Sequence, residues 1–134
     1  MKVILDQDAL QIINLFQTLT GSTVMDYGID EDVLYFVVAK GQYGLAVGKG
    51  GVKIKHAEQV FKKTIKVFEY AEDMNEFIKN LIPETLEIES KNGEVLVKVK
   101  PSDRSKVIGK AGKHIRIVNL FVQRLFDVAV VKVK

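Results

Sequence analysis

Two short stretches of the chain each place a lysine between glycines, in similar surroundings. The first is Gly48-Lys49-Gly50-Gly51 and the second is Gly109-Lys110-Ala111-Gly112. Glycine adopts backbone conformations that other residues avoid, and it leaves the main chain open to close approach. A helix that begins after such a loop presents N–H groups and the positive end of its dipole, which favours an anion. The two stretches therefore predict backbone clamps for phosphate groups, with Lys49 and Lys110 at the loop tips.

The two loops belong to an internal repeat. An offset of 61 residues aligns their glycines, their lysines and the isoleucine that follows, together with the strand-like segments 33–41 and 94–102. The copies are diverged but collinear, which indicates two structural units. Residues 49–66 contain six lysines and one acid, and residues 103–116 contain five Lys or Arg and one acid. A single basic run is usually a solvated surface, but two at matching places indicate binding of a polyanion.

Hydrophobic periodicity predicts the same order of elements, α-β-β-α-α-β, in both copies. In the first copy we expect a helix over 9–19 that ends at Gly21, strands over 23–29 and 33–39, a short helix over 43–47, a helix with Ile54, Ala57, Val60 and Phe61 on its apolar face, and a strand over 65–70. In the second copy we expect a helix over 74–82 that Pro83 ends, strands over 84–90 and 95–99 joined by an Asn92-Gly93 hairpin turn, a short helix over 103–108, a long helix over 113–126 and a strand over 128–133. The expected fold class is α+β, with each three-stranded sheet covered by helices.

The length and composition limit the organisation of the chain. It has 134 residues, of which 47% are hydrophobic and 28% charged, as in globular proteins. We expect two units, residues 1–70 and 71–134. Because units of about 65 residues bury little surface, and because the junction 70–73 is short, we expect them to pack against each other.

Several classes of protein are excluded or disfavoured. The absence of cysteine rules out disulfides and Cys-based zinc sites. No apolar run is long enough to span a bilayer, and the first residues lack a signal-peptide cleavage pattern. We therefore expect a soluble cytoplasmic protein without a membrane partner.

Enzymatic activity is not expected. A nucleotide-hydrolysing P-loop needs G-x-x-x-x-G-K-[ST] after a strand. Tyr43 and Gly50 stand where the first loop would need a glycine and a hydroxyl, and Arg104 and Ala111 stand there in the second. The two histidines do not align in the repeat and no paired carboxylates stand out, so we predict no catalysis, no cofactor and no metal.

An apolar wall is expected beside each loop, formed by Val47, Ile54, Ile108 and Ile115. Isoleucines beside a turn mostly belong to the core, but one edge of each could support an unstacked base. A duplex hides its bases, so a single strand is the better ligand.

The loop residues also resemble a known family. The stretches Val47–Ile54 and Ile108–Ile115 resemble the I-G-x-x-G-x-x-I signature of KH domains, and the order α-β-β-α-α-β is similar to the type II form. Two such units in tandem, with GQYGLAVGKGG and the acidic EDMNEFIKNLIP segment, resemble the archaeal NusA-like transcription termination and antitermination proteins. The resemblance covers essentially all 134 residues.

The resemblance implies binding of single-stranded RNA, about four nucleotides per KH groove. It further implies a role in transcription elongation, termination or antitermination, with RNA polymerase or other transcription components as candidate partners. The residues expected to contact RNA are Gly48, Lys49, Gly50, Gly51, Lys53 and Ile54 in the first copy, and Gly109, Lys110, Ala111, Gly112, Lys113, Ile115 and Arg116 in the second.

Two other functions stay open at this stage. One is a protein-interaction adaptor in which the KH folds serve as scaffolds and the acidic middle segment docks a basic partner. The other is an RNA-binding factor associated with the ribosome and translation. RNA rather than DNA follows from the family resemblance, not from these residues themselves.

Overall fold

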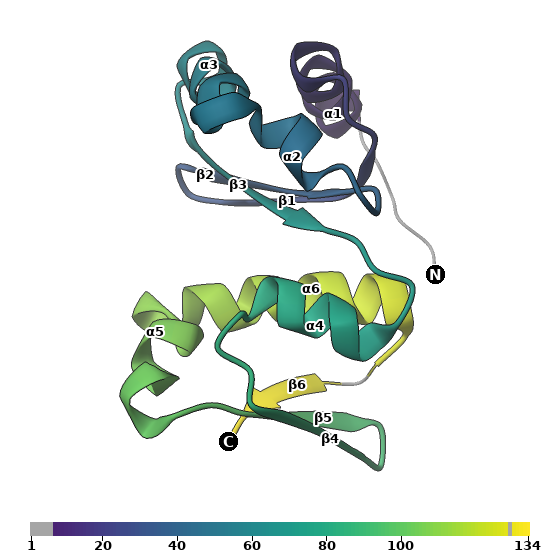
Figure 1. Ribbon diagram of the computed structural model, residues 1–134, viewed down its shortest axis with the longest axis vertical. Coiled ribbons are helices and arrows are strands. Elements are labelled where there is room, and N and C mark those ends of the chain that lie inside the picture. The colour runs from purple at the N-terminus through teal and green to yellow at the C-terminus, as the bar shows by residue number, and fades with distance from the viewer. Residues whose placement is uncertain (1–6, 129) are drawn as a thin grey trace. The chain divides into compact units, whose positions relative to one another are not determined.

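The computed structural model describes residues 7–128 and 130–134, and the chain divides into two compact units. The first extends to Glu72, and the second comprises Asp73–Lys134. Within the described residues each unit has one three-stranded sheet and three α-helices (Figure 1). The expected α+β class and the presence of two sheets are therefore confirmed.

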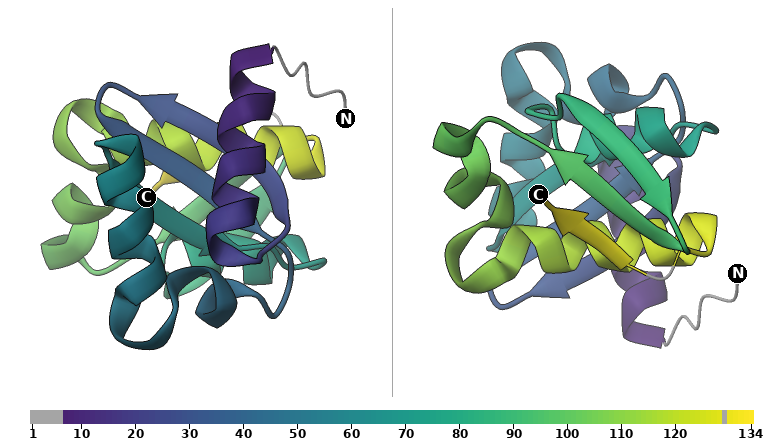
Figure 2. Two further views of the ribbon diagram at one scale, coloured as in Figure 1. Left: turned by 90° about the horizontal axis from the view of Figure 1, so that it is seen from above. Right: turned by 90° about the horizontal axis from the view of Figure 1, so that it is seen from below.

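The first unit follows the predicted order of elements. They are α1 (Gln7–Thr20), β1 (Val24–Asp30), β2 (Val33–Val38), α2 (Tyr43–Val47), a 3₁₀ turn (Lys49–Gly51), α3 (Val52–Phe61) and β3 (Thr64–Glu69). The strand order is β1-β2-β3, with β2 antiparallel to β1 and parallel to β3. Gly21 ends α1 as expected, because at φ 77° its N–H turns back to the Gln17 carbonyl at 2.8 Å. The view from above shows α1 and α3 crossing the same face of this sheet (Figure 2, left).

An aromatic stack forms the centre of the first unit's core. The rings of Phe16 on α1 and Phe36 on β2 lie 3.9 Å apart between centroids and are nearly parallel. Ala57 on α3 is fully buried beside them, and Phe61, one turn later, packs against the same cluster. The prediction for Val60 was wrong: its side chain is 43% exposed. The apolar stripe of α3 passes through Ala57 and Phe61, and Val60 lies about 100° around the helix from Phe61.

The second unit repeats the order of the first. Its elements are α4 (Met74–Leu81), β4 (Glu87–Lys91), β5 (Glu94–Lys98), a 3₁₀ turn (Pro101–Asp103), α5 (Arg104–Ile108), a 3₁₀ turn (Lys110–Gly112), α6 (Lys113–Phe126) and β6 (Val130–Val133). The strand order is β4-β5-β6, again with one antiparallel and one parallel pair. Asn92 and Gly93, with φ 53° and 78°, form the predicted hairpin turn.

The sheet of the second unit is buried on one face. Val95, Val97 and Val99 are buried on the face that α4 and α6 cover (Figure 1). Glu87 and Lys98, which pair across β4 and β5, are exposed on the other face, which is seen from below in Figure 2 (right). This alternation is the one expected of an antiparallel pair with one solvated face.

Several predicted element boundaries differ from the structure, most of them by one or two residues. The strand expected from residue 84 begins at Glu87, because the backbone N–H and the hydroxyl of Thr85 both donate to the Ile82 carbonyl and hold a turn there. The helix expected over 103–108 is the five-residue α5, preceded by a 3₁₀ turn that starts at Pro101. The strand expected over 128–133 is seen from Val130; residue 129 lies outside the described residues.

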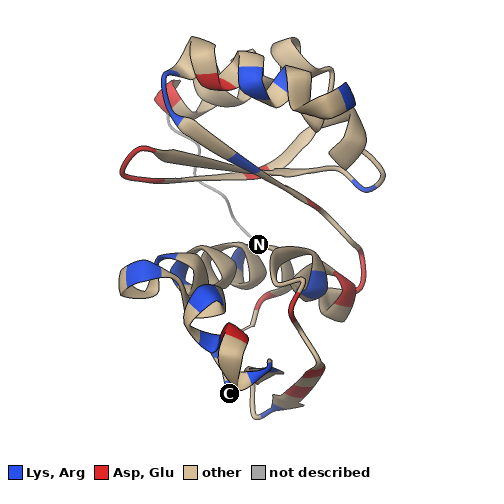
Figure 3. Ribbon diagram, turned by 60° about the vertical axis from the view of Figure 1, so that its left-hand side comes forward, with Lys and Arg blue, Asp and Glu red and all other residues tan. Residues whose placement is uncertain are grey.

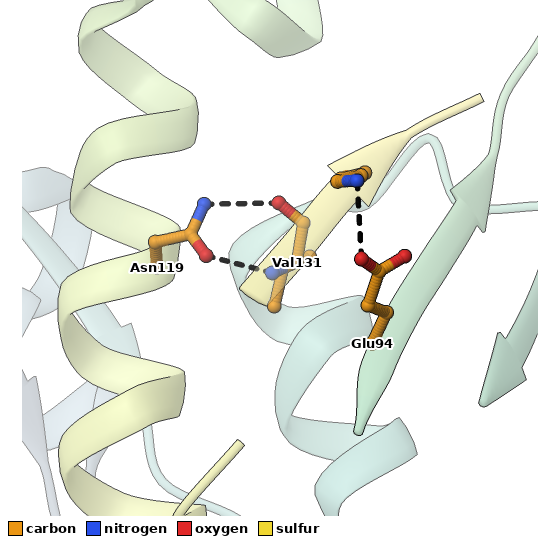
Figure 4. Close-up of polar contacts among 4 residues, drawn as sticks. Glu94, Asn119 and Val131 are labelled. Atoms are coloured by element: carbon orange, nitrogen blue, oxygen red, sulfur yellow. Dashed lines mark hydrogen bonds and ion pairs between the residues drawn. The ribbon is translucent and has the colours of Figure 1, made fainter. Parts of the chain in front are cut away.

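In each unit a side chain of the helix after the glycine loop makes hydrogen bonds to the backbone of the edge strand, and this contact is called the clasp. Glu58 on α3 accepts a hydrogen bond from the Ile65 backbone N–H on β3 at 2.9 Å. Asn119 on α6, 61 residues later, accepts from the Val131 N–H at 2.7 Å and donates to the Val131 carbonyl at 2.9 Å (Figure 4). The same figure shows Glu94 of the neighbouring strand β5, which accepts a hydrogen bond from Lys132 at 3.2 Å. Because β3 and β6 are edge strands, these contacts satisfy main-chain groups that the sheet leaves unpaired.

The clasp in the second unit predicts an order of stability among variants. Asn119→Ala removes the partner of two backbone groups and should lower the free energy of unfolding by about 1–3 kcal/mol. Asn119→Asp should cost at least as much, because it turns the donor into a carboxylate oxygen facing the Val131 carbonyl. Glu58→Gln keeps an acceptor for Ile65 and serves as the control, with little change expected. Urea denaturation at neutral pH measures all three, and an Asn119→Asp variant as stable as the parent would contradict this role.

Candidate functional site

The two glycine loops have the same backbone path. The first glycine has φ 79° and ψ 167° at Gly48, and φ 83° and ψ 166° at Gly109. The third loop residue is left-handed in both, at φ 64° for Gly50 and φ 56° for Ala111. The last glycine follows with φ 77° in the first loop and 75° in the second. The internal repeat predicted from sequence is therefore matched in main-chain geometry.

The first glycine of each loop has no space for a side chain. A Cβ at Gly48 would lie 2.9 Å from the backbone nitrogen of Lys53, and one at Gly109 would lie 2.8 Å from that of His114. Their dihedral angles also belong to a region that is essentially restricted to glycine. Each loop thus begins in direct contact with the first turn of the helix that it introduces.

Some backbone amides of each loop are hydrogen-bonded within the loop, and those at its tip are not. The N–H of Gly51 donates to the Gly48 carbonyl at 3.0 Å, and the equivalent bond in the second loop is 3.1 Å. The first amide of each following helix donates to the carbonyl of the loop lysine. Among the described residues, no hydrogen bond across the first loop uses the amides of Lys49 and Gly50, and both residues are exposed. The described chain therefore leaves the two amides at each loop tip without a hydrogen bond across the loop, whereas the amides that follow them are paired within it.

Lys53 takes a different place from the one expected of it. Its ammonium donates to the Thr20 carbonyl at the end of α1, at 2.8 Å. In the second unit His114 stands at the same position of the repeat, and its Nε2 lies 2.9 Å from the Leu81 carbonyl at the end of α4. A carbonyl only accepts, so this ring nitrogen carries the proton. Both side chains cap the C-terminus of the unit's first helix, where a donor is favoured. We therefore assign Lys53 a structural role.

Basic side chains lie beside the last glycine of each loop. Arg116 donates from Nη1 to the Ala111 carbonyl at 2.6 Å, which holds its guanidinium next to the second loop. Lys55 occupies the same position of the repeat, and its Cε would lie 4.0 Å from a Cβ placed on Gly51. Sequence analysis identified Arg116 but missed Lys55, although the 61-residue offset pairs them. Lys49 and Lys110 are exposed at the tips as expected, and Lys113 is half-buried.

The expected apolar wall is half-buried in both units. Val47, Ile54, Ile108 and Ile115 all have intermediate exposure. Ile54 packs against the core of the first unit. Its methyl carbon would lie 3.8 Å from a Cβ on Gly51, and that of Ile115 would lie 3.9 Å from one on Gly112. Each isoleucine is thus half-buried and lies next to the last glycine of its loop.

One carboxylate lies among the basic residues of the second unit. Glu84 forms an ion pair with Lys106 on α5 at 3.1 Å. Burial raises the pKa of Glu84, but a hydrogen bond from its own backbone, Lys106 and the His114 side chain lower it, so that its pKa lies below the ordinary value. Figure 3 shows that Lys and Arg nevertheless predominate along α5 and the following loop, while Asp and Glu mark β4.

The described residues contain neither a side-chain cluster for a metal ion nor a membrane-spanning helix. Among residues 7–128 and 130–134, no three His, Asp or Glu side chains are close enough to hold a metal ion. No helix within the same residues is long and apolar enough to cross a bilayer.

Comparison with known proteins extends the likeness over both units. A family model described as KH domain matches residues 12–72. The chain is 37% identical to the probable transcription termination protein NusA of Methanococcus vannielii, over 99% of this chain and 80% of that protein. It is 28% identical to the protein of the same description from Thermoplasma acidophilum, over 99% and 96% of the two chains. The crystal structure of APE1850 superimposes with a TM-score of 0.80 at 33% identity, covering 97% of this chain and 100% of that one.

The close contact at the first glycine predicts a difference between glycines of one loop. Gly48→Ala or Gly109→Ala should lower the free energy of unfolding by about 2–4 kcal/mol, because a Cβ would press on backbone and enter a disfavoured conformation. Gly50→Ala, where a Cβ meets nothing within 4 Å, should cost only about 1 kcal/mol for its left-handed conformation. Chemical denaturation of the three variants tests this order, and equal losses at Gly48 and Gly50 would contradict it.

The capping role of Lys53 makes a separate prediction. Lys53→Met keeps most of the stem but removes the donor to Thr20, so it should destabilise the protein by about 1–2 kcal/mol. Lys55→Met, on the same helix and exposed, should change stability by less than about 0.5 kcal/mol. Thermal or urea unfolding compares the pair. If Lys55→Met were the more damaging change, the assignment of the two lysines would have to be reversed.

Proposed function

The chain belongs to the archaeal NusA-like family of KH proteins, and from this membership we propose that it binds single-stranded RNA through both glycine loops and acts in transcription termination. One observation supports RNA binding above the others: in two units with the same backbone path, the exposed tip of each loop carries a lysine and two amides that make no hydrogen bond across the loop. The relatives named as probable transcription termination proteins support the cellular role.

We propose that the second unit is a KH domain like the first, with the boundary near residues 70 and 71. The support is a set of equivalent contacts at the 61-residue offset: the glycine loop, the cap by Lys53 or His114, and the clasp by Glu58 or Asn119. The division of the chain into compact units at Glu72 and Asp73 lies close to this boundary.

The proposed mechanism needs no chemical step. A phosphate approaches the amides at the loop tip, where no side chain blocks access. Lys49 and Lys110 neutralise its charge, and Lys55 and Arg116 extend the basic surface along the next helix. Ile54 and Ile115 then offer an edge against which an unstacked base can lie. A duplex would keep its bases away from this edge, so the site favours single strands.

Two linked units should bind an RNA strand with higher affinity than either unit alone. Each loop meets few phosphates, so a single unit should bind RNA weakly. A strand held by one unit is at high effective concentration for the other, which raises the overall affinity. If roughly four phosphates are neutralised, log K should fall with log salt with a slope near −3. In the cell the bound strand would be nascent transcript, with RNA polymerase or other transcription components nearby and antitermination as an associated activity.

Aspartates at the loop tips test the clamp. The test variant combines four substitutions: Lys49→Asp, Gly50→Asp, Lys110→Asp and Ala111→Asp. They place carboxylates at both loop tips, where an RNA phosphate would meet negative charge. We expect the affinity for a short single-stranded RNA to fall at least about a hundredfold. Asp tolerates the left-handed conformation of Gly50 and Ala111, so the fold should be kept. Fluorescence anisotropy measures binding and circular dichroism checks folding.

A matched control separates the loop from general charge. Gln59→Asp with Lys62→Asp changes the net charge as much as the first-loop pair does, but at the far end of α3. This control should bind RNA within a few-fold of the parent. Undiminished binding by the four-fold loop variant would refute the clamp and leave the protein-interaction adaptor as the better account.

A further inference from the structure

We propose that the two loops share a backbone contact to phosphate but add different side-chain contacts to an RNA strand: the first unit adds base contacts through apolar side chains around its loop, and the second adds phosphate contacts through basic ones. This inference rests on the proposed function, and it assigns Tyr43, Leu45 and Val52 as base-contacting residues. None of the three was among the expected site residues.

The evidence is a systematic exchange of residue type between the units. Around the first loop three large apolar residues are exposed: Tyr43 by 48%, Leu45 by 44% and Val52 by 59%. Tyr43 and Leu45 lie on α2, which leads into the loop, and Val52 is the first residue of α3, which leaves it. Apolar surface is therefore present on both sides of the loop, on the helix that enters it and on the helix that leaves it.

The same three positions of the second unit are basic. The 61-residue offset places Arg104, Lys106 and Lys113 where the first unit has Tyr43, Leu45 and Val52. Arg104 and Lys106 are exposed on α5, and Lys113 begins α6. Lys106 keeps 75% of its side-chain surface exposed despite its ion pair with Glu84. All three exchanges go in the same direction, from apolar to cationic.

The overall charges of the two copies differ in the same sense. Residues 73–134 contain twelve Lys or Arg and eight Asp or Glu, for a net charge of +4. Residues 1–72 contain eight and nine, for a net charge of −1. The long-range attraction of a polyanion is therefore stronger for the second copy as a whole, although both copies have a basic run at the loop.

The first loop still binds an anion by its backbone, and this determines the occupant that we propose. Its tip, like that of the second, has two amides that make no hydrogen bond across the loop, with Lys49 at the tip and Lys55 beside Gly51. A ligand that offers a phosphate to these groups and an apolar ring face to the neighbouring side chains is a nucleotide in a single strand. Aromatic side chains stack on bases of any sequence because every base has a π-face. An apolar protein segment would match the three side chains but would leave the amides without an anion.

Affinity and salt dependence together test the assignment. The first variant combines Tyr43→Ala, Leu45→Ala and Val52→Ala. It should bind a short single-stranded RNA at least about fivefold more weakly than the parent, because the loss of base stacking is of that order or larger. The slope of log K against log salt should not change, because no charge is removed. The second variant combines Arg104→Gln, Lys106→Gln and Lys113→Gln. It should instead make this slope shallower by about 1.5 to 2, at roughly 0.7 for each lost phosphate contact.

The controls keep this test separate from that of the proposed function. Val60→Ala removes an exposed apolar side chain from the same helix as Val52 but outside the loop region, and should bind like the parent. If the parent protein does not bind RNA, the proposed function fails. If it binds and the loop aspartates abolish binding, but the Tyr43, Leu45 and Val52 variant binds as well as the parent or changes only the salt slope, the division of chemistry fails and the clamp stands.

Discussion

The structure depends on one tight contact, between the first glycine of each loop and the first turn of the helix that follows. At Gly48 and Gly109 the backbone approaches the next helix so closely that a single carbon atom would not fit. This contact fixes the angle at which the short helix meets the longer one. The next two residues of each loop are exposed, and their amides make no hydrogen bond across the loop. Tight packing at the first glycine is thus followed directly by an exposed tip.

A second set of contacts keeps that arrangement rigid. The residue that touches the glycine, Lys53 or His114, also caps the first helix of its unit, and one turn and a half later Glu58 or Asn119 clasps the edge strand. The helix after the loop is thus tied to another helix at its start and to the sheet further along. A loop held in this way loses little conformational entropy when it binds, which favours recognition of a flexible strand. Ala111 shows that the path is imposed by these ties, since an alanine there accepts a left-handed conformation that costs it about 1 kcal/mol.

Sequence reasoning succeeded where local rules govern the chain. The glycines, Pro83 and the Asn92-Gly93 turn act through their own backbone preferences, so the ends of elements near them were predicted well. It could not identify the partner of a side chain when that partner is distant in sequence. Lys53 was placed in the ligand site because a lysine beside a glycine loop looks like a phosphate contact, whereas its partner, Thr20, lies 33 residues away in sequence. The equivalence of Lys53 and His114 was also not visible in the sequence, because the residue types differ. Each nevertheless donates a hydrogen bond to the last carbonyl of a helix. Lys55 could have been found, since the repeat aligns it with Arg116, which sequence analysis did select.

The repeat also shows which features of a unit the fold itself requires. Positions that hold the loop in place keep their function in both copies even when the residue changes, as from lysine to histidine or from glutamate to asparagine. Positions that face solvent around the loop are under no such constraint, because nothing in the core depends on them. An arginine can therefore replace a tyrosine there without disturbing the backbone path, as the matching dihedral angles of the two loops show. One chain can in this way carry two glycine loops of the same geometry whose surroundings differ, and under the proposed function a strand that spans both would meet a charged surface at one loop and an apolar surface at the other.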